Sequence, residues 1–289
     1  MGVPGFFGWL VKIIEEFKKF KLLEENVLNI IIETLKIPVN KFYIDGNCLI
    51  HPICFYTLTK YKDDPRIDEI NFLRDRMFKN ILKYIIYLVS YVKPKEVFLA
   101  IDGVAPLAKI NQQRKRRFMS VLDTELINLI KKNHGVYKEE IWNNTCISPG
   151  TEFMEQLHQF LLKNLKILNT IKGKGHVKIT YSSYHTPSEG EHKILQDIKL
   201  CNNTLCDVIY GLDADLIFLS LASHKDNIYL LREESQIKND IQKNDSMYES
   251  LNYISIYDFK QAINYKINSD IKRKLNECYN CNNTFNNYS

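Results

Sequence analysis

Short runs of consecutive apolar residues alternate along this chain with longer stretches in which apolar residues return every three or four positions. The short runs are typical of buried strands, and the longer stretches are typical of amphipathic helices. Strands are predicted at residues 42–45, 97–102, 177–181, 207–210 and 228–231. Helices are predicted at roughly 70–93, 106–119, 151–168 and 188–199. This alternation predicts an α/β fold with a mostly parallel central sheet and helices on both of its faces.

Length and composition predict one folded domain. The 289 residues are 45% hydrophobic, which is enough for a single large core. Residues 1–275 are assigned to this domain, which is predicted to begin with an amphipathic helix between Phe6 and Phe17. The polar stretch 233–249 is predicted to be a loop. The Asn-rich tail 276–289 lacks periodicity and is predicted to be disordered.

Charge and cysteine content bear on location more than on chemistry. The net charge of +5 permits a nucleic-acid partner without arguing for one. The seven cysteines are scattered, which is typical of reduced thiols in an intracellular protein of the cytoplasm or nucleus. No run of about 20 apolar residues is present, so we expect no membrane-spanning segment.

Acidic residues collect at the predicted strand ends. Two strands end in an aspartate, a third leads into an Asp-Ala-Asp sequence, and one helix opens with two glutamates. These acids are Asp45, Asp102, Glu189, Glu191, Asp213 and Asp215. They converge if their strands are neighbours, because function gathers at the carboxyl ends of strands in open α/β sheets.

Six carboxylates in one cleft repel one another unless protons or cations bind. Oxygen ligands without histidine or cysteine favour Mg²⁺ or Mn²⁺. Two such ions about 4 Å apart can activate a water and stabilise the leaving oxygen of a phosphodiester, which is nuclease chemistry. Each acid also has a simpler interpretation. An aspartate after a strand is usually a turn former or a cap, and Glu189 and Glu191 complement a helix dipole. Spacing alone leaves both interpretations open.

A basic helix follows the strand that carries Asp102. Lys109, Gln113, Arg116 and Arg117 share one face of this helix because they lie at i, i+4, i+7 and i+8. Two guanidinium groups, an ammonium and an amide suit a terminal phosphate, which arginine binds bidentately. The alternatives are a solvated surface helix or a nuclear-localisation run.

Several segments together carry a family resemblance. They are MGVPGFFGWL at the start, YIDGNCLIH at 43–51, VKPKEVFLAIDGVAPLAKINQQRKRRF at 92–118, CISPGTEFM at 146–154, SEGEHKI at 188–194, and IYGLDADLIFLSLASH with LLRE through 233. On these residues the chain resembles the N-terminal catalytic region of the XRN family of 5′→3′ exoribonucleases. The resemblance implies a 5′ nuclease or PIN-like fold. It also implies hydrolysis of single-stranded RNA with a 5′-monophosphate to mononucleotides, dependent on two Mg²⁺ or Mn²⁺ ions.

The resemblance assigns roles to individual residues. The six acids match the metal-binding acids of the family, and Lys109, Gln113, Arg116 and Arg117 match its 5′-monophosphate pocket. Asn47 matches a polar residue near the scissile phosphate, and His51 matches a residue that stacks on the terminal base. Without the resemblance, His51 is interpreted as a core or turn histidine.

The chain departs from the family pattern in three places. Leu107 stands where the family usually has a basic residue, and Ser188 replaces a usual glycine. A further metal-binding aspartate, in a Gly-Asn-Asp-Phe segment, and the second conserved region are not found in this sequence. We therefore expect a nuclease domain that is incomplete on its C-terminal side and that a separate C-terminal polypeptide completes.

Two other functions compete with this one. A DNA-directed nuclease of the flap endonuclease kind shares the α/β sheet, the Glu-Gly-Glu and the Asp-Ala-Asp sequences, whereas the NQQRKRRF segment favours RNA. A non-catalytic RNA-binding module is the second alternative, motivated by the missing aspartate. Binding to RNA is expected to weaken as salt rises.

Overall fold

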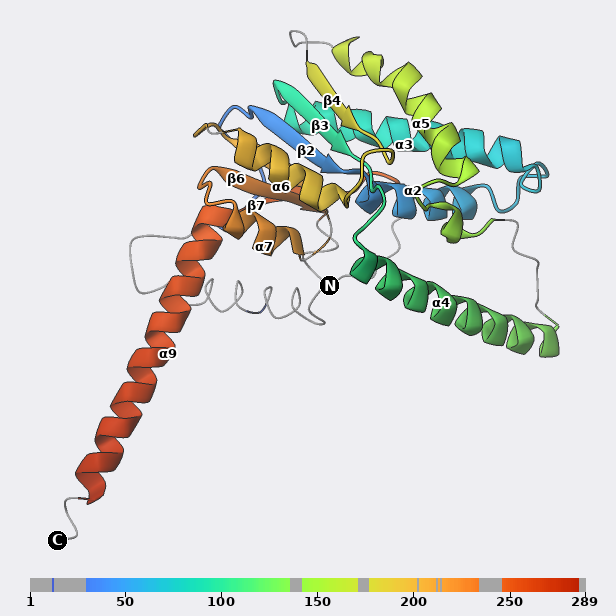
Figure 1. Ribbon diagram of the computed structural model, residues 1–289. Helices are drawn as coiled ribbons and strands as arrows, with labels where there is room; N and C mark the ends of the chain where they lie inside the picture. The colour runs from blue at the N-terminus through green and yellow to red at the C-terminus, as the bar shows by residue number, and fades with distance from the viewer. Residues whose placement is uncertain are drawn as a thin grey trace.

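In the described part of the chain, seven strands form one sheet in the order β1-β7-β6-β5-β2-β3-β4 (Figure 1). The computed structural model describes residue 12 and residues 30–135, 142–170, 177–201, 203–211, 213, 215–233 and 246–285; side chains are described as far as residue 274. The predicted helix between Phe6 and Phe17 lies outside these residues. Among them, no helix is both long and apolar enough to cross a membrane.

The centre of the sheet is parallel. Five consecutive strands pair in parallel register, with Asp45 opposite Ala100 and Ile44 opposite Tyr210. They are β2 (Lys41–Asp45), β3 (Glu96–Ala100), β4 (Lys178–Ser182), β5 (Asp207–Tyr210) and β6 (Ile228–Glu233). The mostly parallel sheet predicted from the sequence is therefore confirmed.

An antiparallel edge was not predicted. β7 (Leu251–Ser255) pairs antiparallel with β6, and β1 (Ile31–Ile32) pairs antiparallel with β7. The prediction that residues 228–231 form the last strand was wrong. β7 directly follows a polar stretch, and Asn252 interrupts its apolar residues, so the sequence carries little signal for it.

Helices cover both faces of the sheet, as predicted. Alternate side chains of β2 enter different clusters: Phe42 and Ile44 pack in one, and Tyr43 packs in the other. The first cluster lies under α2 (Gly46–Lys60), α3 (Ile70–Val92) and α5 (Glu152–Asn164). The second lies under α6 (Gly190–Leu200), α7 (Asp215–Ala222) and the start of α9 (Ile256–Phe285) (Figure 1).

Local signals explain two of the helix boundaries. α3 ends at Val92, just before Pro94, and Lys93 caps it in the left-handed region with φ 55°. α5 begins after Thr151, whose hydroxyl accepts a hydrogen bond from the Met154 amide. It gives way at Leu165 to a 3₁₀ helix, η2 (Leu165–Thr170), although the predicted helix continued to residue 168.

Two long helices project from the body of the protein. α4 (Leu107–Asn133) extends well past the predicted end at 119, and none of its residues is buried. In Figure 1 it leaves the sheet below α2, and α9 leaves the opposite side. α9 runs to Phe285, so the backbone from 276 to 285 is helical where a disordered tail was predicted.

Candidate active site

The strands that lead into the predicted aspartates are neighbours. β2 lies between β5 and β3, and all three are parallel, so their carboxyl ends meet at one edge of the sheet. Asp45 is the last residue of β2, and Asp102 follows β3 by two residues. The convergence that spacing left open is thus a property of the strand order.

The start of α6 sits between the first two of these acids. The Gly190 amide donates a hydrogen bond of 2.6 Å to Asp102 Oδ1. A β-carbon at Gly190 would lie 2.9 Å from Asp45 Oδ1 and 3.3 Å from Asp102 Oδ1, so a side chain would press on both carboxylates. The absence of a side chain at Gly190 lets the helix carry Glu189 and Glu191 up to the two aspartates.

The loop before α6 is held against the end of β3. The Gly103 amide donates to the Ser188 carbonyl, and the Ser188 amide donates to the Val104 carbonyl, both at 2.9 Å. A β-carbon at Gly103 would lie 1.9 Å from the Thr186 carbonyl oxygen, so this contact requires glycine. Ser188 adopts φ 97°, a region that glycine favours, so its backbone conformation is strained for a serine.

Burial disfavours the ionised form of these acids. Asp45 is 5% exposed, and burial, with the charge of Asp102 next, raises its pKa to about 8. Burial, together with Glu189, Asp213 and Asp215, raises the pKa of Glu191 to about 7. Burial also raises the pKa of Asp102, although the bond from Gly190 opposes this.

Two buried carboxylate oxygens in the cluster have no hydrogen-bond partner: Asp45 Oδ1 and Glu191 Oε2. The other Asp45 oxygen accepts a hydrogen bond from Cys48 Sγ at 3.1 Å. Orphaned buried carboxylate oxygens carry a large desolvation cost that a bound divalent cation would offset. The residues therefore fit a site for hard cations.

Asp213 and Asp215 join the cluster from the loop after β5 and the start of α7. The Asp213 side chain is exposed, and its carbonyl accepts a 2.6 Å hydrogen bond from Nη2 of the buried Arg232. Burial lowers the pKa of Arg232 to about 10. The charge of Asp213 raises the pKa of Asp45, Asp102 and Glu191, so it acts on all three.

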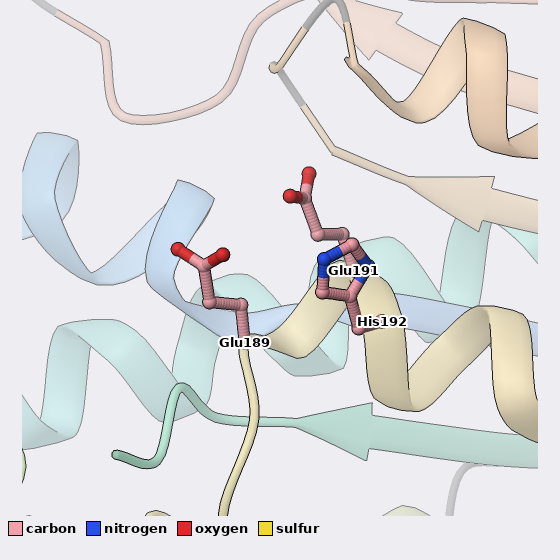
Figure 2. A group of neighbouring side chains, drawn as sticks. All are labelled: Glu189, Glu191 and His192. Atoms are coloured by element: carbon pink, nitrogen blue, oxygen red, sulfur yellow. The ribbon is translucent and has the colours of Figure 1, made fainter. Parts of the chain in front are cut away.

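A histidine that the sequence interpretation missed lies with the glutamates. Ligand atoms of Glu189, Glu191 and His192 all lie within 4.8 Å of one another. Figure 2 shows the two carboxylates leaving the start of α6 on the same side, with the His192 ring beside Glu191. The one signal in the sequence was its position next to Glu191 in the segment Glu-Gly-Glu-His.

A pocket of about 460 Å³ lies on one side of the acids and gathers most of the predicted substrate residues. His51 is partly buried, and burial, followed by the charge of Arg117, lowers its pKa. Ser120 and the segment around η1 (Asn144–Cys146) complete the wall and were not predicted. The predicted residues in this lining are Asn47, His51, Asp102, Gln113, Arg116 and Arg117.

Lys109 lies one to two turns before the rest of its predicted group on α4. It lines a second pocket of about 530 Å³ together with Glu189, Glu191, His192 and Asp215. Its Nζ lies 3.2 Å from Glu189 Oε1. Burial lowers the Lys109 pKa, but the hydrogen bond to Glu189 and the charges of Glu189 and Glu191 outweigh burial and raise it. Lys109 therefore brings the start of the basic helix next to the acids.

The sequence of this chain is similar to that of several known proteins. Residues 1–234 match the family model described as XRN 5'-3' exonuclease N-terminus. The chain is 38% identical over 250 residues to 5'-3' exoribonuclease 1 of Homo sapiens, an alignment that covers 81% of this chain and 13% of the human protein. It is 35% identical over 265 residues to 5'-3' exoribonuclease 2 of Arabidopsis thaliana, covering 81% of this chain and 25% of that protein. The chain thus spans a quarter or less of the length of these two relatives.

Proposed function

Since this chain belongs to the XRN 5'-3' exonuclease family, as its match to the N-terminus model shows, we propose that it hydrolyses single-stranded RNA stepwise from a 5′-monophosphate end. The observation that carries the proposal is the position of Asp102. Its carboxylate accepts a hydrogen bond at the start of α6, within the acid cluster, and it also lines the pocket that contains Arg116 and Arg117. A phosphate held by the arginines would place the adjoining RNA backbone beside the acids.

The acid cluster would hold two Mg²⁺ or Mn²⁺ ions through Asp45, Asp102, Glu189, Glu191, Asp213 and Asp215. Ions of this class, when bound, supply an activated water and charge stabilisation for the leaving oxygen of a phosphodiester. The side chains themselves would fix where the ions sit, because β2, β3 and α6 hold Asp45, Asp102 and Glu191 in place.

The arginine pocket would select the 5′ end. Arg116 and Arg117 offer guanidinium forks for a terminal monophosphate, and Gln113 adds an amide donor. These donors suit a single terminal phosphate, so we expect capped or triphosphorylated ends to bind poorly. His51, half-buried beside Arg117, would stack on the terminal base.

Asn47 would orient both the acid and the substrate. Its Oδ1 accepts a hydrogen bond of 3.1 Å from the Asp102 amide, and Asn47 lines the same pocket, to which it would offer its amide nitrogen. That nitrogen is a donor suited to the scissile phosphate. Lys109, paired with Glu189, would neutralise part of the charge where the RNA backbone meets the acids.

A substrate comparison tests the proposal. We expect the purified chain with Mg²⁺ to degrade 5′-monophosphorylated single-stranded RNA faster than DNA of the same sequence or a flapped DNA duplex. Asp45→Ala should abolish this activity, whereas Asp75→Ala, which breaks an exposed ion pair with Lys79 on α3, should retain it. Faster cutting of the flap would favour a DNA-directed nuclease.

Because the chain spans only part of the length of its relatives, a second experiment tests whether another polypeptide must complete the site. Binding of RNA without hydrolysis, with activity restored by a separate C-terminal polypeptide, would show that this chain supplies only part of the site. Salt-sensitive binding alone, without restoration, would identify a non-catalytic RNA-binding module.

A further inference from the structure

His192 adds a nitrogen ligand to one side of the acid cluster. Six oxygen ligands alone favour hard ions, but an imidazole changes the chemistry of the site it joins. We propose that Glu189, Glu191 and His192 form a mixed nitrogen–oxygen site for a divalent ion that accepts an imidazole ligand more readily than Mg²⁺ does, such as Zn²⁺ or Mn²⁺. The inference deepens the proposed function, because it takes Glu189 and Glu191 to be metal ligands and adds the ligand that sets their ion preference.

The backbone of α6 places the three side chains on one turn. Glu189 is the residue before the helix, and its carbonyl accepts a 3.1 Å hydrogen bond from the His192 amide, which closes the first turn. Residues three apart face the same side of a helix. His192 also lines the 530 Å³ pocket together with both glutamates, so an ion from solvent can reach all three.

The separation of the ligand atoms is close to what one ion needs. Zinc lies about 2.0–2.2 Å from nitrogen and carboxylate oxygen, so two ligands on opposite sides of an ion are at most about 4.4 Å apart. The three ligand atoms lie within 4.8 Å of one another. Small rotations of the half-buried Glu189 and His192 side chains would close that difference.

Glu191 supplies an independent sign of a ligand. It is 8% exposed, and its Oε2 is buried without a hydrogen-bond partner. A glutamate that only complemented the helix dipole would face solvent at the helix start. Figure 2 shows its carboxylate directed away from the helix axis, on the side where Glu189 also projects. A buried, unpartnered oxygen in this position is accounted for by a cation.

The Lys109 ammonium group competes with a bound ion for the Glu189 carboxylate. Its Nζ lies 3.2 Å from Glu189 Oε1, so an ion that binds Glu189 must displace or share this contact. Removing the ammonium group should therefore tighten ion binding at this site. This effect is specific to the site. Among the described residues, Lys109 forms an ion pair with Glu189 and none with Asp45 or Asp102.

The test is direct metal binding to the RNA-free chain. Calorimetric titration with Zn²⁺, Mn²⁺ and Mg²⁺ would compare the unchanged chain with His192→Ala and with the control His185→Ala, which removes an exposed imidazole that lies 3.5 Å from the Glu155 carboxylate, outside the acid cluster. We expect His192→Ala to weaken Zn²⁺ and Mn²⁺ binding at least tenfold and Mg²⁺ binding about twofold or less. His185→Ala should change none of them, and Lys109→Met should tighten Zn²⁺ binding.

A spectroscopic measurement distinguishes the loss of a nitrogen ligand from misfolding of the variant. Electron spin echo spectroscopy of bound Mn²⁺ should show a directly bound nitrogen in the unchanged chain. The signal should disappear in His192→Gln, whose amide oxygen can still coordinate an ion. A missing nitrogen signal in the unchanged chain, or equal weakening of all three ions by His192→Ala, would overturn the inference.

The experiments distinguish failure of the inference from failure of the proposed function. RNA hydrolysis with Mg²⁺ but no effect of His192→Ala on Zn²⁺ binding would overturn the inference alone. His192-dependent Zn²⁺ binding without Mg²⁺-dependent RNA hydrolysis would support the inference and count against the proposed function.

Discussion

The Gly190 amide lies 2.6 Å from Asp102 Oδ1, and no side chain at position 190 separates the helix from that carboxylate. This contact joins the end of β3 to the start of α6, and it sets the distance between the aspartate and glutamate halves of the acid cluster. A β-carbon here would lie 2.9 Å from Asp45 Oδ1, closer than side-chain carbons approach other atoms.

Gly190→Ala should therefore damage the site despite the higher helix propensity of alanine. The substitution would favour helix α6 by up to about 1 kcal/mol but push Asp45 and Asp102 apart. We expect Mg²⁺ binding at least tenfold weaker, measured by calorimetry. Gly135→Asn is the control, since position 135 is open and its φ of 69° suits asparagine. Unchanged Mg²⁺ binding in Gly190→Ala would show that α6 does not need this close contact.

The pH dependence of metal binding follows from the raised acid pKa values. Burial raises the pKa of Asp45 to about 8 and that of Glu191 to about 7, so protons compete with Mg²⁺ near neutrality. We expect Mg²⁺ affinity to rise steadily between about pH 6 and pH 8.5. An affinity that is flat across this range would show that the two acids are ionised before the ion binds.

The same groups affect the stability of the metal-free protein with a defined sign. A folded-state pKa above the unfolded value means that folding binds protons, so stability falls as pH rises from about 4 to about 8. In EDTA, the melting temperature should therefore be lower at pH 8 than at pH 6 if these acids dominate. Mg²⁺ should raise it more at pH 8 than at pH 6. Thermal melts at the two pH values, with and without Mg²⁺, check this.

Lys193 is expected to stabilise the segment that carries Asp102. Its side chain is buried, and Nζ donates to the Ile101 carbonyl at 2.7 Å and to the Ser183 carbonyl at 2.9 Å. Burial lowers its pKa to about 8, and the charge of Asp102 opposes that shift. Lys193→Met should lower the free energy of unfolding by about 2–4 kcal/mol, because two carbonyls lose their donor. Urea denaturation measures this change. A loss below about 1 kcal/mol would show that water replaces the ammonium group.

Arg117 tests the pocket for the 5′ end. Arg117→Ala should slow degradation of 5′-monophosphorylated RNA by about 10- to 100-fold, the loss of a charge-assisted phosphate contact of roughly 1.5–3 kcal/mol. RNA with a 5′-hydroxyl should be affected little. Arg114→Ala is the matched control, because Arg114 is exposed and does not line the pocket. Equal slowing of both RNAs would place Arg117 in general backbone binding.

Much of the sheet could be predicted because most of its strands are short apolar runs that the local sequence reveals. Asp45 and Asp102 each follow a short apolar run, and the parallel order of β2 and β3 then brings them together. Helix α2 was missed because Pro52 lies inside it and Pro usually interrupts helices. β7 was missed because pairing with β6, rather than a local pattern, makes it a strand.

The site was only partly accessible from the sequence. Helical spacing placed Lys109, Arg116 and Arg117 on one face of a helix, and α4 spans all three, but spacing does not report that Lys109 Nζ lies 3.2 Å from Glu189 Oε1. His192 was missed because its role depends on how near its ring lies to two carboxylates, which spacing along the chain does not report. The roles of these side chains stay predictions until they are measured.

Product analysis under single-turnover conditions tests the proposed activity most directly. The purified chain would be mixed with excess Mg²⁺ and a 5′-monophosphorylated single-stranded RNA. We expect 5′-mononucleotides to appear in order from the 5′ end, and their release to stop with EDTA and with Asp45→Ala. Release that begins at the 3′ end, internal cleavage products, or an equal rate in EDTA would contradict the proposed role of the acid cluster.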